Sequence, residues 1–373
     1  MPVRLSYSED EVEDLIQEAL SGRISVSLIE KLLRVENVHL LGKHAHDVRT
    51  RLCGRYGTFV VNMVLNYTNV CYVRCKFCAF WRDRSAQDAY VLVPEEAARL
   101  VKYVDSLYGP LRQVLVQGGI NPEVSIEYIE QLFRCIKRHV PHVAIHGLSP
   151  LEVHYICVKE RLSYREAFER LKEAGLDSMP GGGGEILVDN VRRVISPGKI
   201  SSDTWIRVME EAHRVGIKTS ATMMYGHIET ISEQAQHLYR IYELQLKTGG
   251  FNAFIAWNFE PKNTHLEKMR IIKYPEGPYT LLKIVSTARL VFRHHIPHIQ
   301  SSWLTNGLHI AQLSLLYGAD DFGGTLYNEK VVPAAGVNVP VLTRADIVHL
   351  IRKVGLVPAE RDNFYNIVKV YGN

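Results

Sequence analysis

Cys71, Cys75 and Cys78 are the residues whose types and spacing indicate chemistry most directly. They form a C-x3-C-x2-C run and are half of the six cysteines in this chain of 373 residues. Thiolates this close together usually hold a metal ion or an iron–sulfur cluster. A structural zinc ion needs four ligands, and a closed iron–sulfur cube takes four cysteines. Three local cysteines would therefore leave one iron open to a small molecule.

Other interpretations of the three cysteines are a zinc site completed by one of the sixteen histidines, three reduced thiols, or an electron carrier. Zinc modules usually pair C-x2-C knuckles, and a carrier normally closes its cluster with a fourth nearby cysteine. The spacing therefore favours the open cluster. The scattered Cys53, Cys135 and Cys157 are interpreted as ordinary reduced thiols.

Composition narrows the function classes. The net charge of +4 is spread along the chain without a Lys/Arg block, so we expect no nucleic-acid partner. No apolar run approaches the ~20 residues of a membrane span, and the N-terminus lacks a signal-peptide pattern. We therefore expect a cytoplasmic protein without membrane insertion. With 46% hydrophobic residues, the chain can bury a large core.

The hydrophobic periodicity predicts an α/β fold. Residues 1–57 read as a helical extension, and the remainder, 58–373, alternates strands with helices. Eight strand candidates over about 300 residues favour a TIM-type (β/α)8 barrel over a doubly wound sheet, because no Gly-x-Gly-x-x-Gly follows the first strand. The candidates are 59–65, 113–117, 143–146, 176–179, 218–224, 253–258, 296–300 and 319–322. Ser8, Asp203, Ser232 and Thr343 are candidate helix N-caps.

Residues that can bind or react fall at the ends of these strands, where the active site of such a barrel lies. Four consecutive glycines before Glu185 cost backbone entropy that a simple connection does not need, so we expect them to leave room for a ligand. The candidate set by strand is Gln117, Gly118 and Gly119; Ser149; Glu185; Thr222, Met224, Gly226 and His227; and Asp320.

The run from Cys71 to Cys78, with Phe77 before the last cysteine, resembles the signature of radical S-adenosylmethionine (SAM) enzymes. The resemblance implies a 4Fe–4S cluster on the three cysteines, with SAM on the open iron and Phe77 near the adenine. It also implies cofactor contacts from the strand ends, at Gln117, Gly118, Gly119, Ser149, Glu185, Thr222, Met224 and Gly226. The usual G-x-I-x-G-x-x-E motif has Thr222 for its first glycine and Met224 for its isoleucine.

Longer motifs resemble one radical SAM subgroup, which holds the futalosine-pathway menaquinone enzymes and the deazaflavin synthase subunits. The resemblance covers about residues 8–355 and is carried by residues 67–71, 75–80, 180–185, 221–229 and 320–324. Residues 253–261 and 301–303 look most like the dehypoxanthine futalosine cyclases. Aminofutalosine synthase is the near alternative. Gly184 and Ala256 depart from the pattern, where Ala and Pro are expected.

The resemblance to the cyclases implies a reaction. A 5′-deoxyadenosyl radical removes hydrogen from the ribose part of dehypoxanthine futalosine, and the sugar radical closes a ring onto the benzoate. Loss of one proton and one electron then gives the product, so a base is needed. His227, Glu185 and Asp320 are the candidates. The cluster also implies an external one-electron reductant such as flavodoxin or ferredoxin.

Overall fold

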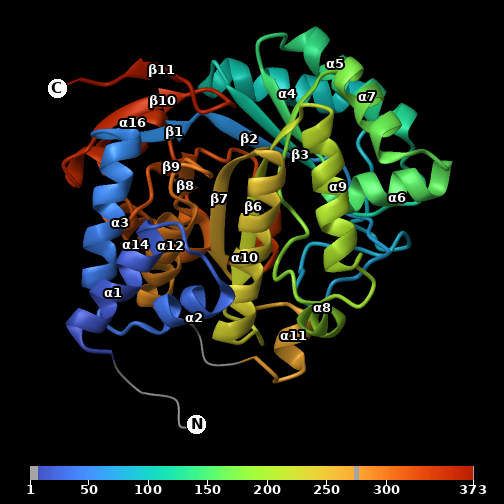
Figure 1. Cartoon of the computed structure of the whole chain (residues 1–373). Coiled ribbons are helices and arrows are strands. Elements are labelled where there is room, and N and C mark those ends of the chain that lie inside the picture. The colour runs from blue at the N-terminus through green and yellow to red at the C-terminus, as the bar shows by residue number, and fades with distance from the viewer. Residues whose placement is uncertain (1–6, 273–276, 373) are drawn as a thin grey trace.

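The computed structural model describes residues 7–272 and 277–372 and has the α/β barrel that the sequence predicts (Figure 1). All eight predicted strand regions carry a strand. The strands are β1 (Tyr56–Val60), β2 (Asn62–Asn66), β3 (Gln113–Gln117), β4 (Ala144–Gly147), β5 (Leu176–Met179), β6 (Lys218–Tyr225), β7 (Phe251–Asn258), β8 (His298–Gln300) and β9 (Asp321–Gly324).

The first strand of the barrel is broken in two, and this break closes the ring. β1 and β2 follow each other in the chain, with Val61 between them. β1 pairs in parallel with β9, and β2 pairs in parallel with β3. Parallel pairing continues from β3 through to β9. The two halves of one strand therefore join both ends of the sheet.

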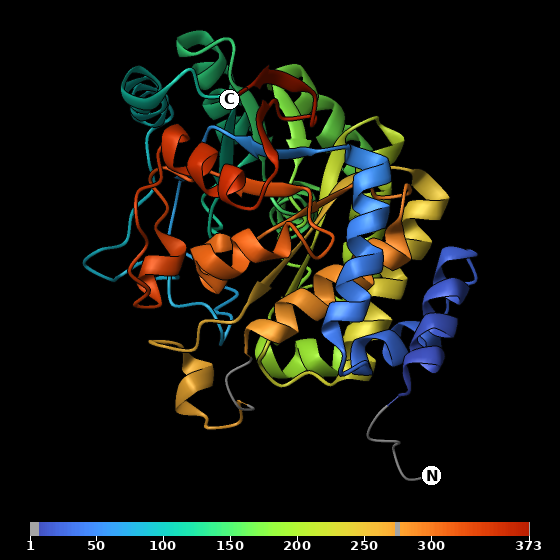
Figure 2. The same ribbon diagram turned by 90° about the vertical axis from the view of Figure 1, so that its left-hand side faces the viewer.

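Helices surround the strands (Figures 1 and 2). They are α4 (Pro94–Tyr108), α5 (Ile126–His139), α6 (Pro150–Glu160), α7 (Tyr164–Ala174), α8 (Asp189–Ile195), α9 (Ser202–Arg214), α10 (Ile231–Thr248), α11 (His265–Lys268), α12 (Pro278–Phe292), α13 (Trp303–Asn306), α14 (Leu308–Ser314), α15 (Val331–Ala334) and α16 (Arg344–Lys353). Among the described residues, no helix is both long enough and apolar enough to cross a membrane.

The predicted N-caps are half right. Ser8 and Thr343 cap their helices through capping boxes. Asp203 and Ser232 do not, because Ser201 and Thr230 occupy the cap positions two residues earlier. In both cases a hydroxyl accepts the N3 amide, which any of these residue types can do, so composition alone does not select the position.

Three N-terminal helices pack against the side of the barrel: α1 (Glu9–Leu20), α2 (Val26–Arg34) and α3 (Val38–Cys53). α3 lies along α12, and α2 lies along α10. Their apolar faces belong to the same continuous hydrophobic core as the barrel. The boundary at residue 57 therefore stays a prediction about chain organisation.

Two further strands, β10 (Val357–Arg361) and β11 (Ile367–Val370), were not among the predicted elements. β10 runs parallel to β1, and β11 returns antiparallel to β10. β10 lies next to β1 at the top of Figure 1, with β11 on its outer side. The turn between them brings Asn363 and Tyr365 against the N-terminal ends of the barrel strands, where they form a floor.

Candidate active site

The cysteine loop follows β2 and is held at several points. The Cys71 amide donates to the carbonyl of Arg82 at 3.1 Å, so the loop returns on itself. In the middle of the loop, the backbone amide of Lys76 donates to the carbonyl of Ile195, and the backbone carbonyl of Lys76 accepts from the amide of Leu266. The loop is therefore fixed by α8 on one side and α11 on the other.

The three thiols lie close enough to influence one another. Burial raises the pKa of Cys75 to about 12; nearby Lys199 opposes this rise, while Cys78 and Cys71 add to it. Burial also raises the pKa of Cys78, with Cys71 contributing in the same direction. Bound iron would hold such thiols as thiolates, because a metal cation reverses the penalty for the charged form.

One cavity of about 430 Å³ runs through the barrel beneath this loop. Cys78 and Phe77 line it at the C-terminal ends of the strands, and Arg361 and Tyr365 line it at the floor. Its middle is apolar and aromatic. The residues lining the middle include Val64, Leu115, Met224, Ile255, Trp257, Trp303 and Leu326.

The end of β3 approaches the cysteine loop closely. A Cβ on Gly119 would lie 2.3 Å from the carbonyl oxygen of Val70, so a side chain there would displace the loop. The amide of neighbouring Gly118 donates to Glu152 at 3.0 Å. Gln117 lines the cavity.

Ser149 caps α6 instead of facing the cavity. Its hydroxyl and amide both donate to Glu152, at 2.6 and 2.7 Å. Glu152 also accepts from the Tyr67 hydroxyl at 2.8 Å. Ser149 therefore supports the Gly118 turn through Glu152, and its proposed cofactor contact stays a prediction.

The glycine run after β5 wraps around an arginine. Arg192 donates to the carbonyls of Gly183 and Gly184, at 3.0 and 2.8 Å. A Cβ on Gly182 would lie 2.5 Å from the Gln117 side-chain nitrogen, so this glycine permits a close approach to β3. The run thus packs closely against Gln117 and Arg192 at the cavity wall, and the room for a ligand that its composition indicated stays a prediction.

Glu185 is joined to the aromatic residue of the cysteine loop, Phe77, through Lys199. Lys199 Nζ lies 2.6 Å from Glu185 Oε1 and 4.8 Å from the centre of the Phe77 ring. The second oxygen, Oε2, has no hydrogen-bond partner among the described residues, and Arg192 is its cationic neighbour at 3.8 Å. Both side chains of the Glu185–Lys199 pair are 6% exposed.

The end of β6 forms the adjoining wall. Thr222 and Met224 line the cavity, and the Thr222 hydroxyl donates to the carbonyl of Gly181 at 2.6 Å. The amide of Gly226 donates to Glu229 at 2.7 Å, in a turn with φ of +87° at the glycine. Although burial raises the pKa of Glu229, His227 and the Gly226 amide bring it down to about 2.

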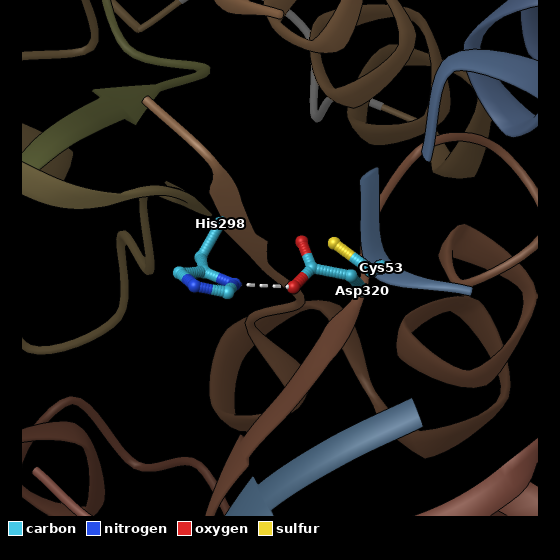
Figure 3. A group of neighbouring side chains, drawn as sticks. All are labelled: Cys53, His298 and Asp320. Atoms are coloured by element: carbon cyan, nitrogen blue, oxygen red, sulfur yellow. Dashed lines mark hydrogen bonds and ion pairs between the residues drawn. The ribbon is translucent and has the colours of Figure 1, made fainter. Parts of the chain in front are cut away.

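Two of the three predicted bases lie away from the cavity lining. His227 is 1% exposed and ion-pairs with Glu229 at 2.9 Å. Asp320 lies just before β9, at the opposite end of the barrel from the cysteine loop, where it pairs with Arg289 and His298. Figure 3 shows Asp320 beside His298 and Cys53. Burial would raise the pKa of Asp320, but these two partners lower it.

Several lining or supporting residues were missed by sequence reasoning. Lys199 follows a Pro-Gly turn that packs closely on the cysteine loop. A Cβ added to Gly198 would lie only 3.0 Å from the carbonyl oxygen of Val73. Glu260, after β7, lines the cavity as a partly buried carboxyl. Burial raises its pKa, and no neighbouring charge contributes to the shift. Arg361 and Asn363 belong to the unpredicted floor.

These residues fit an iron–sulfur cluster and SAM. Cys71, Cys75 and Cys78 would hold the cluster, the side-chain-free turn at Gly118 and Gly119 admits a close backbone contact, and Glu185 Oε2 is an unused acceptor. Most of the predicted cofactor residues are thus gathered around one end of the cavity.

Comparison with known proteins agrees with this site. Residues 65–239 match the Radical SAM superfamily, and residues 248–372 match the CofH/MqnC C-terminal region. The chain belongs to the radical SAM superfamily, in the branch that carries this C-terminal region. It is an enzyme, and its cofactors are a 4Fe–4S cluster and SAM.

Two curated relatives are similar over nearly their whole length. The cyclic dehypoxanthine futalosine synthase of Halalkalibacterium halodurans is 38% identical over 362 residues, covering 96% of both chains. The 5-amino-6-(D-ribitylamino)uracil–L-tyrosine 4-hydroxyphenyl transferase of Methanopyrus kandleri is 36% identical over 371 residues, covering 99% of this chain and 100% of its own.

Solved structures share the fold. Methylornithine synthase has a TM-score of 0.69 at 18% identity, covering 92% of this chain and 97% of its own. The FeFe-hydrogenase maturase of Carboxydothermus hydrogenoformans has a TM-score of 0.72 at 17% identity, covering 96% and 81%.

Proposed function

We propose that the enzyme converts dehypoxanthine futalosine to its cyclic form in menaquinone biosynthesis. The observation that carries the proposal is the continuous cavity that leads from Cys78 down to Tyr365 past two tryptophans, Trp257 and Trp303. Such a cavity suits one elongated substrate in which a sugar is joined to an aromatic acid, so that both reacting parts are held in one space.

When bound, the cluster and SAM supply a carbon-centred radical that removes a hydrogen atom from the substrate. The chain's own residues do the positioning. Lys199 offers an ammonium for the carboxylate of SAM, and Glu185 Oε2 offers an acceptor for a hydroxyl. The apolar wall of Leu115, Ile255 and Trp257 keeps water from a substrate radical.

The final proton needs an acceptor inside the cavity. Among the three predicted bases, Glu185 lines the cavity, but it is tied to Lys199 and Arg192. Glu260 also lines the cavity, and no neighbouring charge holds it in the ionised form. We therefore assign the proton transfer to Glu260, with Glu185 holding the cofactor.

A second candidate function is transfer of the tyrosine side chain to a ribitylaminouracil, as in the Methanopyrus kandleri relative. Its similarity to this chain is 36% over 371 residues, nearly that of the cyclase relative. The transferase reaction requires two separate substrates. One uninterrupted cavity favours the cyclase, because a single molecule can fill it.

The deciding experiment is a product assay. Anaerobically reconstituted and reduced enzyme would be incubated with SAM and dehypoxanthine futalosine, or with SAM, tyrosine and 5-amino-6-(D-ribitylamino)uracil, and analysed by mass spectrometry. The cyclised product should appear in the first mixture. Deoxyadenosine without cyclised product in the first, together with coupled product in the second, would replace the cyclase with the transferase.

The proposal also includes an external one-electron reductant such as flavodoxin or ferredoxin, because a low-potential cluster must be reduced before each radical is formed. A cytoplasmic setting is part of the same proposal. None of the six cysteines forms a disulfide, which fits a reducing compartment.

A further inference from the structure

The floor of the cavity contains a chain of three amide side chains. The backbone amide of Leu326 donates to Asn62 Oδ1 at 2.9 Å. Asn62 Nδ2 donates to Gln113 Oε1 at 3.0 Å, and Gln113 Nε2 donates to Asn363 Oδ1 at 2.8 Å. Each side chain therefore accepts on its oxygen and donates from its nitrogen.

The direction of this series of hydrogen bonds is fixed by its first donor, the backbone amide of Leu326. A backbone N–H can only donate, so Asn62 must present oxygen to Leu326 and nitrogen to Gln113. The same reasoning passes along to Asn363, whose oxygen also accepts from the Ser178 hydroxyl at 3.0 Å. The group left over at the end is Asn363 Nδ2, a donor.

Asn363 Nδ2 has no hydrogen-bond partner among the described residues, although Asn363 is 5% exposed. Asn363 lines the cavity. A buried donor without an acceptor costs about 1–3 kcal/mol, so native structures seldom keep one unless a ligand or water completes it. The free donor indicates that an acceptor on a ligand belongs there.

The charge around the floor favours an anionic acceptor. Arg361 pairs with Asp321, while Arg112 and Arg344 both pair with Glu360. Of these cations, Arg361 lines the cavity, as does Lys218 at the N-terminal end of β6. Burial and then the positive charge of Arg361 lower the pKa of the lining residue His146 to about 3.

The dimensions place this donor opposite the cofactor end. β2 runs from Asn62 at the floor to Asn66 beside the cysteine loop, and its four steps of about 3.3 Å separate the two ends by roughly 13 Å. A substrate whose sugar reacts near the cysteine loop would have to extend its other end toward the floor.

We propose that the floor is the subsite for the carboxylate of the substrate's aromatic acid, with Asn363 Nδ2 as the donor that binds it. The inference rests on the proposed function and deepens it, because it orients the substrate with its sugar toward the cysteine loop. Arg361 contributes through its charge, and three of its five N–H groups are held by Asp321 and the Asp362 carbonyl.

The test compares dehypoxanthine futalosine with its methyl ester, which keeps the shape and loses the charge. Binding would be followed through the fluorescence of Trp257 and Trp303 in reconstituted, unreduced enzyme without SAM. Asn363→Asp keeps the acceptor for Gln113 and Ser178 but places a negative charge at the free position. We expect it to weaken binding of the acid by about tenfold or more and to leave the ester within about twofold.

Asn121→Asp is the matched control. Asn121 is also buried, at 7% exposed, and its Nδ2 also lacks a partner, but it lies outside this cavity. It should not change the ratio of acid to ester affinity. Circular dichroism and thermal melting of each variant check folding, and Asn363→Ala gives a second variant that should also reduce the preference for the acid.

Equal weakening of acid and ester in Asn363→Asp would overturn the inference, as would wild-type enzyme that binds the ester as tightly as the acid. Neither result depends on turnover. If the product assay fails while the acid preference persists, the proposed reaction is wrong and the carboxylate subsite stands.

Discussion

Lys199 donates a hydrogen bond from Nζ to Glu185 Oε1 across 2.6 Å, with both side chains buried and Glu185 lining the cavity. The two residues lie fourteen positions apart and come from different loops. Their pairing places one cation and one anion beside Phe77, which is the arrangement that a zwitterionic cofactor would need.

Replacing Lys199 with methionine should weaken SAM binding by at least about tenfold, since a charge-assisted contact is lost. It should also lower the free energy of unfolding by roughly 3–5 kcal/mol, because Glu185 loses its closest counter-charge in a buried position. Isothermal titration of reconstituted enzyme with SAM and chemical denaturation measure the two effects. Lys172→Met, at an exposed lysine bonded to the Val215 carbonyl, is the control. Unchanged SAM affinity in K199M would remove Lys199 from the site.

Replacing Cys75 with alanine should abolish formation of deoxyadenosine while the barrel remains folded. Two remaining cysteines cannot hold the open cluster in place. Iron and sulfide analysis after anaerobic reconstitution, together with circular dichroism, measures both properties. Cys157→Ala removes a buried free cysteine from α6 and should retain the full iron content. SAM cleavage that persists in C75A would contradict the ligand assignment.

Replacing Glu260 with glutamine should lower the rate of cyclised product by roughly 10²–10⁴-fold, the usual contribution of a positioned base. SAM cleavage should continue, so the ratio of deoxyadenosine to product should rise. Mass spectrometry of both compounds in one reaction measures this ratio. Glu267→Gln, at an exposed residue of α11, is the control for charge loss near the same end of the barrel. If the ratio of deoxyadenosine to product in E260Q equals that of wild type, another group is the proton acceptor.

The same residue sets an expected pH dependence. Burial raises the pKa of Glu260 above its ordinary value, and a base must be ionised to accept a proton. The rate of product formation should therefore fall, as the pH is lowered, already at a pH above the ordinary glutamate pKa of 4.5. Single-turnover rates between about pH 5 and 8 test this, and the acid limb should disappear in E260Q.

Glu229, whose pKa is shifted downward, predicts a pH dependence of stability. Its pKa in the folded protein is about 2, below the ordinary value of 4.5, so its ionised form stabilises the fold above pH 4.5. The contribution, roughly 3 kcal/mol, should be lost as the pH falls from 4.5 toward 2. The difference in unfolding free energy between wild type and Glu229→Gln should therefore shrink over this range. A constant difference would show that the carboxylate's charge is not what stabilises the Gly226 turn.

The barrel could be predicted from sequence because each strand candidate, such as 113–117, is a short apolar run bounded by turn residues and followed by a helical period. The cysteine loop could be predicted because its spacing is itself the signal. β10 and β11 escaped prediction because their residues are largely polar or exposed, as at Glu360 and Lys369. In addition, β10 joins the sheet through β1, which lies about 300 positions earlier.

The charged groups around the cavity could not be predicted from sequence in the same way. Lys199 and Glu260 belong to no sequence motif or periodic pattern. What sets each apart is the burial of a charged group, which only the folded chain shows. Asp320 was chosen because it lies near a strand, but its position before β9 puts it at the wrong end of the barrel. The strand was predicted over 319–322 and begins two residues later, an offset that composition does not determine.

The turn between β10 and β11 has a kinetic consequence. Because Arg361 and Tyr365 line the floor of the cavity, we expect large ligands to enter and leave past the cysteine loop. A substrate that reaches the floor must bind before SAM occupies the entrance, and its product must leave after SAM's product has left. We therefore expect an ordered binding mechanism. Deoxyadenosine formed from SAM would then block the entrance of the cavity. Its dissociation would limit the rate at which the next turnover begins.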